Sequence, residues 1–191
     1  QEITKLMVFN ELFKKIINIQ GSIVEFGIHN GNTLFTLGHL SEIFEHRNYS
    51  RQIIGVDPLK DYSLPNGKTI GYDSKNKLNK SIELFNKSCI FNQFSKIKLI
   101  QKSFIKGCSE IVEKDDFICS MLIMHIGLYK EEKYILNSLF DKMPKGGIIV
   151  FGSLNSKDTP ECTKALLKSI GLNHKICRFD FATKYSYLIK K

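Results

Sequence analysis

Ile23-Val24-Glu25-Phe26-Gly27-Ile28-His29-Asn30-Gly31-Asn32-Thr33 joins a short apolar run to a loop with two glycines and a helix-like segment. The run Ser22–Phe26 predicts a buried strand, and the segment from Asn32 onward predicts a helix. A strand, a tight loop and a helix N-terminus in this order are typical of nucleotide-cofactor binding. Loops that hold a pyrophosphate space their glycines more closely than Gly27-x-x-x-Gly31, so this spacing favours a phosphate-free ligand such as S-adenosylmethionine.

Length and composition predict a single domain over residues 1–191, with an N-terminal helix within residues 1–20. The chain has 191 residues, of which 42% are apolar and 25% charged, as in ordinary globular domains. No apolar run approaches the roughly 20 residues that span a bilayer, and Lys14 and Lys15 interrupt any secretory pattern. We therefore expect a cytoplasmic protein that does not enter the membrane. The five cysteines form no Cys-x-x-Cys pair, so they predict neither a disulfide framework nor a zinc site.

The formal net charge of +9 could attract nucleic acid, lipid or a phosphorylated substrate. The lysines are scattered along the whole chain and form no block of five or six like charges. This distribution favours a small anionic acceptor, such as a sugar nucleotide, over nucleic acid. The sequence is compatible with a homodimer.

Hydrophobic periodicity predicts strands alternating with helices and a closing hairpin. The expected strands are 22–26, 52–56, 97–101, 117–126, 148–151, 175–181 and 184–189. The expected helices are 5–19, 32–46, 77–94, 106–113, 130–142 and 157–170, with an irregular functional loop over 59–75. The last two strands lie so close in sequence that they must be antiparallel. The fold class is therefore α/β, with a doubly wound, mostly parallel seven-stranded sheet that ends in an antiparallel β-hairpin.

Chemistry-bearing residues gather where predicted strands end. Glu25 can accept from a ligand ammonium group, and the helix-start amides with Thr33 can hold a carboxylate. Asp57, which ends the second strand before Pro58, can bind both ribose hydroxyls of an adenosine. The alternative is that the Glu25–Thr33 segment is an ordinary strand-to-helix turn and that Asp57 only starts a turn. The predicted cofactor-binding residues are Glu25, Phe26, Gly27, Asn30, Gly31, Asn32, Thr33, Asp57, Pro58, Ser103 and Phe104.

Two positions keep competing interpretations. Ser103 could bond adenine and Phe104 could stack on it, but a helix cap followed by a core phenylalanine fits these residues equally well. His125, at the end of the fourth parallel strand, is the best candidate for a catalytic general base. The alternative for His125 is a core histidine whose ring nitrogens are satisfied by neighbours.

Four segments, taken in order, resemble the macrocin O-methyltransferase (TylF) and cephalosporin-hydroxylase-like group of class I methyltransferases. They are Val24-Glu25-Phe26-Gly27, Ile54-Gly55-Val56-Asp57, His125-Ile126-Gly127-Leu128-Tyr129 and Lys145-Gly146-Gly147-Ile148-Ile149-Val150-Phe151. The closing Arg178-Phe179-Asp180-Phe181 and Ser186-Tyr187 are similar to that group's C-terminal hairpin. The resemblance implies methyl transfer from S-adenosylmethionine to a hydroxyl, or less often an amine, of a sugar or natural-product intermediate. It also implies that Glu25, Gly27, Gly31 and Thr33 lie on the methionine-binding loop and Asp57 on the ribose.

The chain departs from that group where its metal-dependent members carry acidic pairs. The two positions of the first pair are His125 and Gly127, and those of the second are Gly152 and Ser153. Mg²⁺ needs several oxygen ligands, usually including carboxylates, so we predict no metal site. The leading hypothesis is a metal-independent small-molecule methyltransferase with His125 as base. Alternatives are a catalytically degenerate adenosylmethionine-binding or scaffold protein, an NAD-dependent oxidoreductase, which the glycine spacing and the hairpin disfavour, and an RNA methyltransferase, which rests on charge alone.

Overall fold

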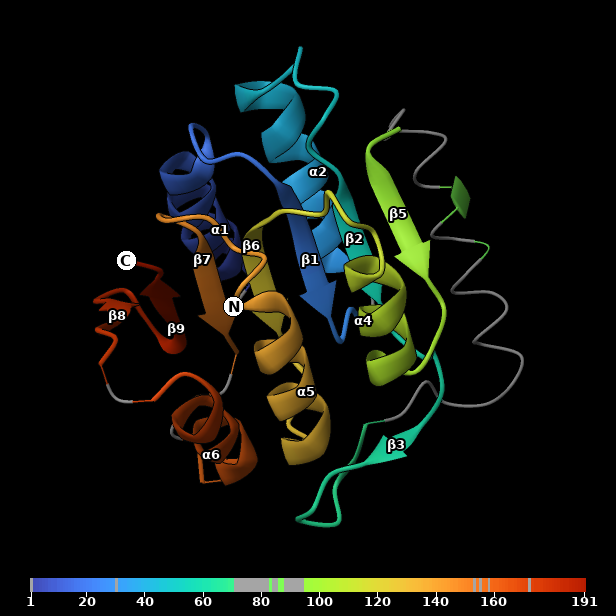
Figure 1. Ribbon diagram of the computed structural model, residues 1–191, viewed down its shortest axis with the longest axis vertical. Coiled ribbons are helices and arrows are strands. Elements are labelled where there is room, and N and C mark those ends of the chain that lie inside the picture. The colour runs from blue at the N-terminus through green and yellow to red at the C-terminus, as the bar shows by residue number, and fades with distance from the viewer. Residues whose placement is uncertain are drawn as a thin grey trace.

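A seven-stranded sheet forms the middle layer of the protein (Figure 1). The computed structural model describes residues 2–29, 31–70, 83, 86–87, 95–152, 154, 156–157, 159–171 and 173–191. The strands lie in the order β5-β2-β1-β6-β7-β9-β8, and β5, β2, β1, β6 and β7 are mutually parallel. Their bounds are Ile97–Ile100 (β5), Ile53–Val56 (β2), Ser22–Phe26 (β1), Cys119–Met124 (β6), Ile148–Phe151 (β7), Ala182–Ile189 (β9) and Ile176–Phe179 (β8).

The central strands are apolar along almost their whole length because helices cover both faces of the sheet. Every residue of β2, β6 and β7 is buried. The predicted strand 117–126 is shorter in the structure, since β6 ends at Met124. The His125 amide still donates to the Phe26 carbonyl at 2.9 Å, and the chain then turns away at Gly127, where φ is +77°. This exit places His125 on the edge of the sheet.

The predicted antiparallel hairpin is confirmed. Strand β9 pairs antiparallel with β7 on one side and with β8 on the other. The hairpin therefore extends the parallel sheet beyond β7 and carries Tyr185 and Tyr187 into the core beside α1. These two tyrosines bury most of their surface although the strand lies near the edge of the sheet.

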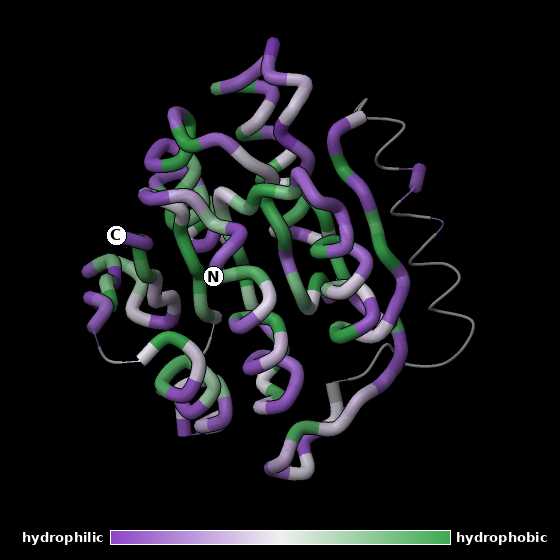
Figure 2. The backbone as a smooth tube through the Cα atoms, viewed as in Figure 1, coloured by the Kyte–Doolittle hydropathy of each residue, from purple (hydrophilic) through white to green (hydrophobic). Residues whose placement is uncertain are grey.

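Helices cover the sheet in two layers. Helices α4 (Phe104–Val112), α5 (Tyr129–Leu139) and α6 (Pro160–Ser169) lie in front of it in Figure 1, and α1 (Glu2–Ile16) and α2 (Asn32–Phe44) lie behind. Alternate strand residues serve the two layers: Ile23 packs with α1 and α2, whereas Val24 packs with α4 and α5. Figure 2 shows hydrophobic residues concentrated along the inner strands.

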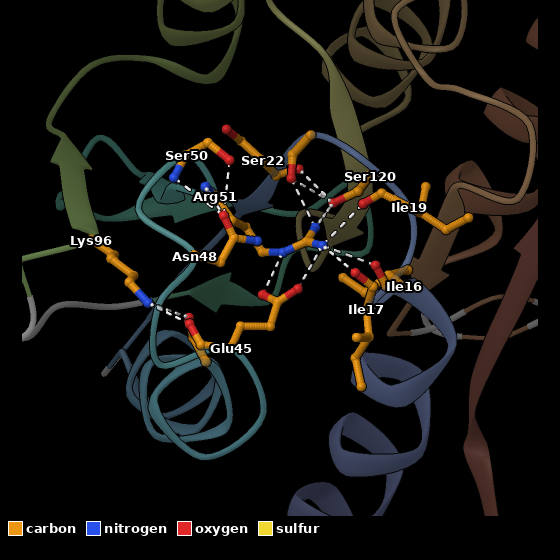
Figure 3. A network of polar contacts seen from close by, with 12 residues as sticks. Ile16, Ile17, Ile19, Ser22, Glu45, Asn48, Ser50, Arg51, Lys96 and Ser120 are labelled. Atoms are coloured by element: carbon orange, nitrogen blue, oxygen red, sulfur yellow. Dashed lines mark hydrogen bonds and ion pairs between the residues drawn. The ribbon is translucent and has the colours of Figure 1, made fainter.

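Arg51 joins α1, the end of α2 and β6 at the amino edge of the sheet (Figure 3). Its guanidinium forms a two-point ion pair with Glu45, with nitrogen–oxygen distances of 2.6 and 2.9 Å. It also donates to the carbonyls of Ile16 and Ile19, each at 2.9 Å, and to the Ser120 hydroxyl. The planar fork of arginine suits such a site, because it satisfies several acceptors at once. Arg51 thereby fixes the C-terminal end of α1, and the opposite end of that helix reaches the other edge of the sheet.

The segment 59–75, expected to be irregular, contains a small hairpin in its described part. Strands β3 (Tyr62–Ser63) and β4 (Thr69–Ile70) pair antiparallel around the predicted Leu64–Gly67 turn. Most of the predicted helix 77–94 lies outside the described residues. Within the described part of the chain, no helix is long and apolar enough to cross a membrane.

Candidate functional site

The carboxyl ends of the parallel strands bring three loops into direct contact. Gly27 follows β1, His125 follows β6 and Gly152 follows β7. The Gly152 amide donates to the carbonyl of Met124 at 3.1 Å, so the loop after β7 lies beside His125. Gly27 approaches even more closely, because a Cβ built there would lie 2.6 Å from the His125 carbonyl oxygen. Its φ of +84° also favours glycine. The first loop glycine therefore lets two strand ends meet.

A cavity of about 150 Å³ lies at this edge. Four of the predicted site residues line it: Glu25, Gly27, Asp57 and His125. The remaining lining residues are Lys5, Ile28, His29 and Tyr62. Lys5 comes from the first turns of α1, so the N-terminal helix covers the cavity as well as packing on the sheet.

Glu25 is the most unusual group in this cavity. Its side chain is 1% exposed, and neither carboxylate oxygen has a hydrogen-bond partner among the described residues. The Nδ1 atom of His125 lies 3.3 Å from its Oε1. Burial, and then the charge of Glu25, raise the pKa of Tyr185 above its ordinary value. A buried carboxylate needs compensation, so Glu25 fits a cationic or hydrogen-bond-donating ligand.

Asp57 connects the loops after β1 and β2. Its Oδ1 accepts from the Leu59 amide at 2.8 Å, and its Oδ2 accepts from the His29 amide at 3.4 Å. These two bonds to backbone amides hold the Asp57 side chain in place. Both His29 and Leu59 have positive φ, 50° and 49°, which is uncommon for residues other than glycine. Of these two residues, His29 lines the cavity.

A second, larger cavity of about 390 Å³ adjoins the first. His125 and Lys5 line both cavities, so they stand between them. The larger cavity is bounded by the loops after β6 and β7, the β3–β4 turn and β9. Its described lining residues include three lysines and no carboxylate: Lys5, Leu64, Lys68, His125, Ile126, Gly127, Gly152, Ser156, Thr159, Lys184 and Tyr185.

The other predicted cofactor residues that the structure describes are not among the residues that line the smaller cavity. Gly31 is the N-cap of α2 with φ +76°, and Asn32 begins that helix. Thr33 is buried in its first turn, and its hydroxyl has no hydrogen-bond partner in the described part of the chain. Phe26 belongs to the core, and Pro58 is half-buried after Asp57. Asn30 lies outside the described residues.

The Ser103-Phe104 pair has the geometry of a helix start. Ser103 is the N-cap residue of α4, and Phe104 is buried with its ring edge-on to Tyr62, at a centroid distance of 5.6 Å. Ser103 lines an open groove of about 710 Å³ with Lys60 and Lys102, not the cavity at Glu25. The structure therefore has Ser103 at a helix cap and Phe104 in the core, as in the second interpretation of these residues. Their contact with a ligand remains a prediction.

Sequence reasoning missed several residues that line the two cavities. Lys5 and Tyr185 come from the two ends of the chain, and only the folded sheet brings them to His125. The Tyr185 ring lies 6.1 Å from the imidazole, centroid to centroid, at an angle of 61°. Tyr62 and Lys68 belong to the segment 59–75, which the sequence marked as functional without identifying a residue.

Comparison with known proteins places the fold. No family model matches the sequence, and no curated protein matches it. The solved structures that it resembles include CalS11, described as a calicheamicin methyltransferase, with 20% identity and a TM-score of 0.82. An apo structure of CalS11, described as a TDP-rhamnose 3'-O-methyltransferase, has 22% identity and a TM-score of 0.79. Each match covers 98% of this chain and 79% of the other. The O-methyltransferase NovP has 14% identity and a TM-score of 0.71, over 99% of this chain and 80% of its own.

The chain has the class I methyltransferase fold. This confirms the predicted doubly wound sheet with its terminal hairpin. Membership of the macrocin O-methyltransferase group within this fold stays a prediction. Within the described residues of this methyltransferase fold, no group of three or more His, Cys, Asp or Glu side chains could hold a metal ion. The four positions that the sequence comparison assigns to acidic pairs are His125, Gly127, Gly152 and Ser153. Ser153 lies outside the residues that the structure describes.

Proposed function

We propose that this chain transfers a methyl group from S-adenosylmethionine to a hydroxyl of an anionic small molecule, with His125 as general base. The single observation that carries the proposal is the buried carboxylate of Glu25, which lies next to His125 in a cavity at the carboxyl edge of a methyltransferase-type sheet. The cavity brings together an uncompensated carboxylate, an imidazole and a glycine loop.

The residues around the smaller cavity fit S-adenosylmethionine. Glu25 would accept from its ammonium group, which supplies the compensation that the buried carboxylate lacks. Asp57, fixed by two backbone amides, would accept from the ribose hydroxyls. The uncapped first turn of α2, with the Thr33 hydroxyl, would take the carboxylate. When bound, this cofactor supplies an electrophilic methyl group.

His125 is suited to remove the proton of the acceptor. Its Nε2 is buried and has no hydrogen-bond partner among the described residues. Because the imidazole lines both cavities, it lies between an acceptor in the larger cavity and the part of the cofactor held at Glu25 in the smaller one. A positioned base of this kind contributes roughly a hundredfold to ten-thousandfold to a rate. The protein's other contribution is to hold the two reactants in line.

The larger cavity favours an acceptor that carries phosphate. Lys5, Lys68 and Lys184 approach it from α1, the β3–β4 turn and β9, and no carboxylate is among its described lining residues. The positive charge of these lysines would attract a nucleoside diphosphate sugar, which also offers hydroxyl groups. The CalS11 structure described as a TDP-rhamnose 3'-O-methyltransferase has the same fold, which supports this class of acceptor for this chain.

We infer that the proton transfer does not require Mg²⁺. The sequence resembles a group whose metal-dependent members carry two acidic pairs at this edge. In this chain His125 and Gly127 occupy the positions of the first pair, and Gly152 occupies one position of the second. None of these residues is a carboxylate ligand for a hard cation. A MycE structure of similar fold is described as a complex with Mg and SAH, so the comparison group itself includes a metal-containing case.

Calorimetry and turnover assays test the proposal separately. Titration with S-adenosylmethionine, S-adenosylhomocysteine and NAD measures cofactor choice, and the absence of heat with both sulfur compounds would overturn it. Methyl release is then measured over nucleoside diphosphate sugars and the matching free sugars, with and without EDTA. His125→Ala should lower kcat at least a hundredfold. Binding of cofactor without turnover on any acceptor would instead support the non-catalytic alternative.

Neutralising the acceptor lysines tests the anionic class directly. Lys68→Gln and Lys184→Gln should each raise KM for the diphosphate acceptor roughly twofold to fivefold, since an exposed charge pair contributes up to about 1 kcal/mol. Both should leave cofactor affinity unchanged. Lys145→Gln, an exposed lysine before β7 at the opposite edge of the sheet, is the matched control. Equal KM values for all three variants would exclude this role of the lysines.

A further inference from the structure

The imidazole of His125 is held from three sides. Glu25 Oε1 lies 3.3 Å from its Nδ1, and the Tyr185 ring packs against it at 6.1 Å between centroids. Its third side rests over Gly152, where a Cβ would lie 2.3 Å from Cδ2 and 2.9 Å from Nε2. The orientation of the ring is therefore determined by its neighbours.

The contact with Glu25 selects one tautomer of the neutral ring. A neutral imidazole carries a proton on one nitrogen and a lone pair on the other. A lone pair on Nδ1 would face the negative carboxylate at 3.3 Å and be repelled, whereas an N–H there is attracted. The two groups are within ion-pair distance but are not aligned as a hydrogen bond, and catalytic hydrogen bonds often tighten only when substrates bind. The favoured form has its proton on Nδ1 and its lone pair on Nε2.

Gly152 supplies the space that this ring orientation requires. Its φ lies outside the left-handed region, so another residue could adopt its backbone conformation. The obstacle is only the space, since a methyl group would overlap the imidazole. This differs from Gly27, where the overlap is with backbone and φ is positive. A side chain at position 152 would rotate the ring away from Glu25 or push it out of the cavity wall.

We propose that Glu25 and Gly152 are positioning residues for His125. Glu25 keeps the proton on Nδ1, so that Nε2 is the basic nitrogen, and Gly152 leaves the volume that the Nε2 edge of the ring occupies. In the transfer, the acceptor oxygen gains the methyl group and gives its proton to Nε2. The products are a methyl ether, the demethylated cofactor and an imidazolium, which then returns the proton to water. The second oxygen of Glu25 stays available to the cofactor. The catalytic consequence rests on the proposed function, but the tautomer does not.

Nitrogen NMR of the full chain tests the tautomer without any turnover. In ¹⁵N-labelled protein, at a pH where the ring is neutral, the wild type should show Nδ1 protonated and Nε2 unprotonated. Glu25→Leu, which is similar in size and apolar, should return the proton to Nε2. A wild-type ring protonated on Nε2, or a Glu25→Leu ring that keeps the proton on Nδ1, would overturn the role of Glu25. This result is independent of whether the protein methylates anything.

A double-mutant cycle tests Gly152. Gly152→Ala should lower kcat roughly a hundredfold, the scale of a 1 Å misplacement, with cofactor affinity unchanged. In the His125→Ala background the same substitution should have almost no further effect, because the ring that it displaces is gone. An equal loss in both backgrounds would overturn the role of Gly152. Gly152→Ala could fail to fold because its methyl group overlaps the His125 ring. In that case the double variant with His125→Ala should fold, and a double variant that also fails to fold would contradict the overlap.

Discussion

Glu132 is a buried carboxylate in the first turn of α5, beneath the loop that follows His125. Its Oε1 accepts from the Gly127 amide at 2.7 Å. Burial raises the pKa of Glu132 to about 7, an effect larger than the opposing ones of the Gly127 amide and the Cys162 thiol. This residue should make the stability of the whole fold depend on pH.

The direction follows from proton binding. Between pH 4.5, the ordinary pKa of the side chain, and about 7, the folded chain keeps a proton that the unfolded chain has lost. Stability from Glu132 is therefore fully present below pH 4.5 and is lost as the pH rises through about 7. At 1.36 kcal/mol for each pH unit, the loss is about 3 kcal/mol.

Glu132→Gln removes the titration and keeps an oxygen for the Gly127 amide. We expect its free energy of unfolding, measured by urea denaturation between pH 4.5 and 8, to rise relative to wild type by about 3 kcal/mol across this range. Glu131→Gln, in the same turn but half-exposed, is the control and should follow the wild type. Parallel curves for wild type and Glu132→Gln would refute the reasoning.

Three further substitutions test the fold and the cofactor site. Arg51→Ala should lower the free energy of unfolding by about 3 to 5 kcal/mol, because Glu45 is left buried without its partner, whereas the exposed Arg47→Ala should change it by less than about 0.5 kcal/mol. A loss below about 1 kcal/mol in chemical denaturation would show that other contacts hold α1. Gly27→Ala should lower the melting temperature more than Gly67→Ala, since both have positive φ but nothing lies within 4 Å of a Cβ at position 67. Equal shifts would mean that the overlap after β1 is harmless. S-adenosylhomocysteine at a hundredfold excess over its dissociation constant should stabilise the wild type by about 2.7 kcal/mol, and at the same concentration Asp57→Ala should gain clearly less; an undiminished gain would contradict the role of Asp57.

Local patterns in the sequence predicted most of the fold because they carry the information themselves. The apolar run before Gly27 specifies a buried parallel strand, and two strands separated by a few residues can only form a hairpin. Strand ends were less well predicted. The apolar pattern continued through Ile126, but β6 ends at Met124 and the chain turns away from the sheet at Gly127. The small β3–β4 hairpin was missed because two-residue strands have no periodicity to detect.

The sequence by itself determined which residues reach the carboxyl edge of the sheet, since the position of a residue after a parallel strand fixes its place in space. It supplied Glu25, Asp57 and His125 in this way. Only the tertiary structure decided what those residues meet there. Lys5 and Tyr185 lie 180 residues apart in the chain, yet both line the larger cavity beside His125. The overlap that reserves position 152 for glycine is likewise a contact between two loops. Such contacts depend on how strands are ordered across the sheet, and strand order is set by packing between distant segments that no local pattern records.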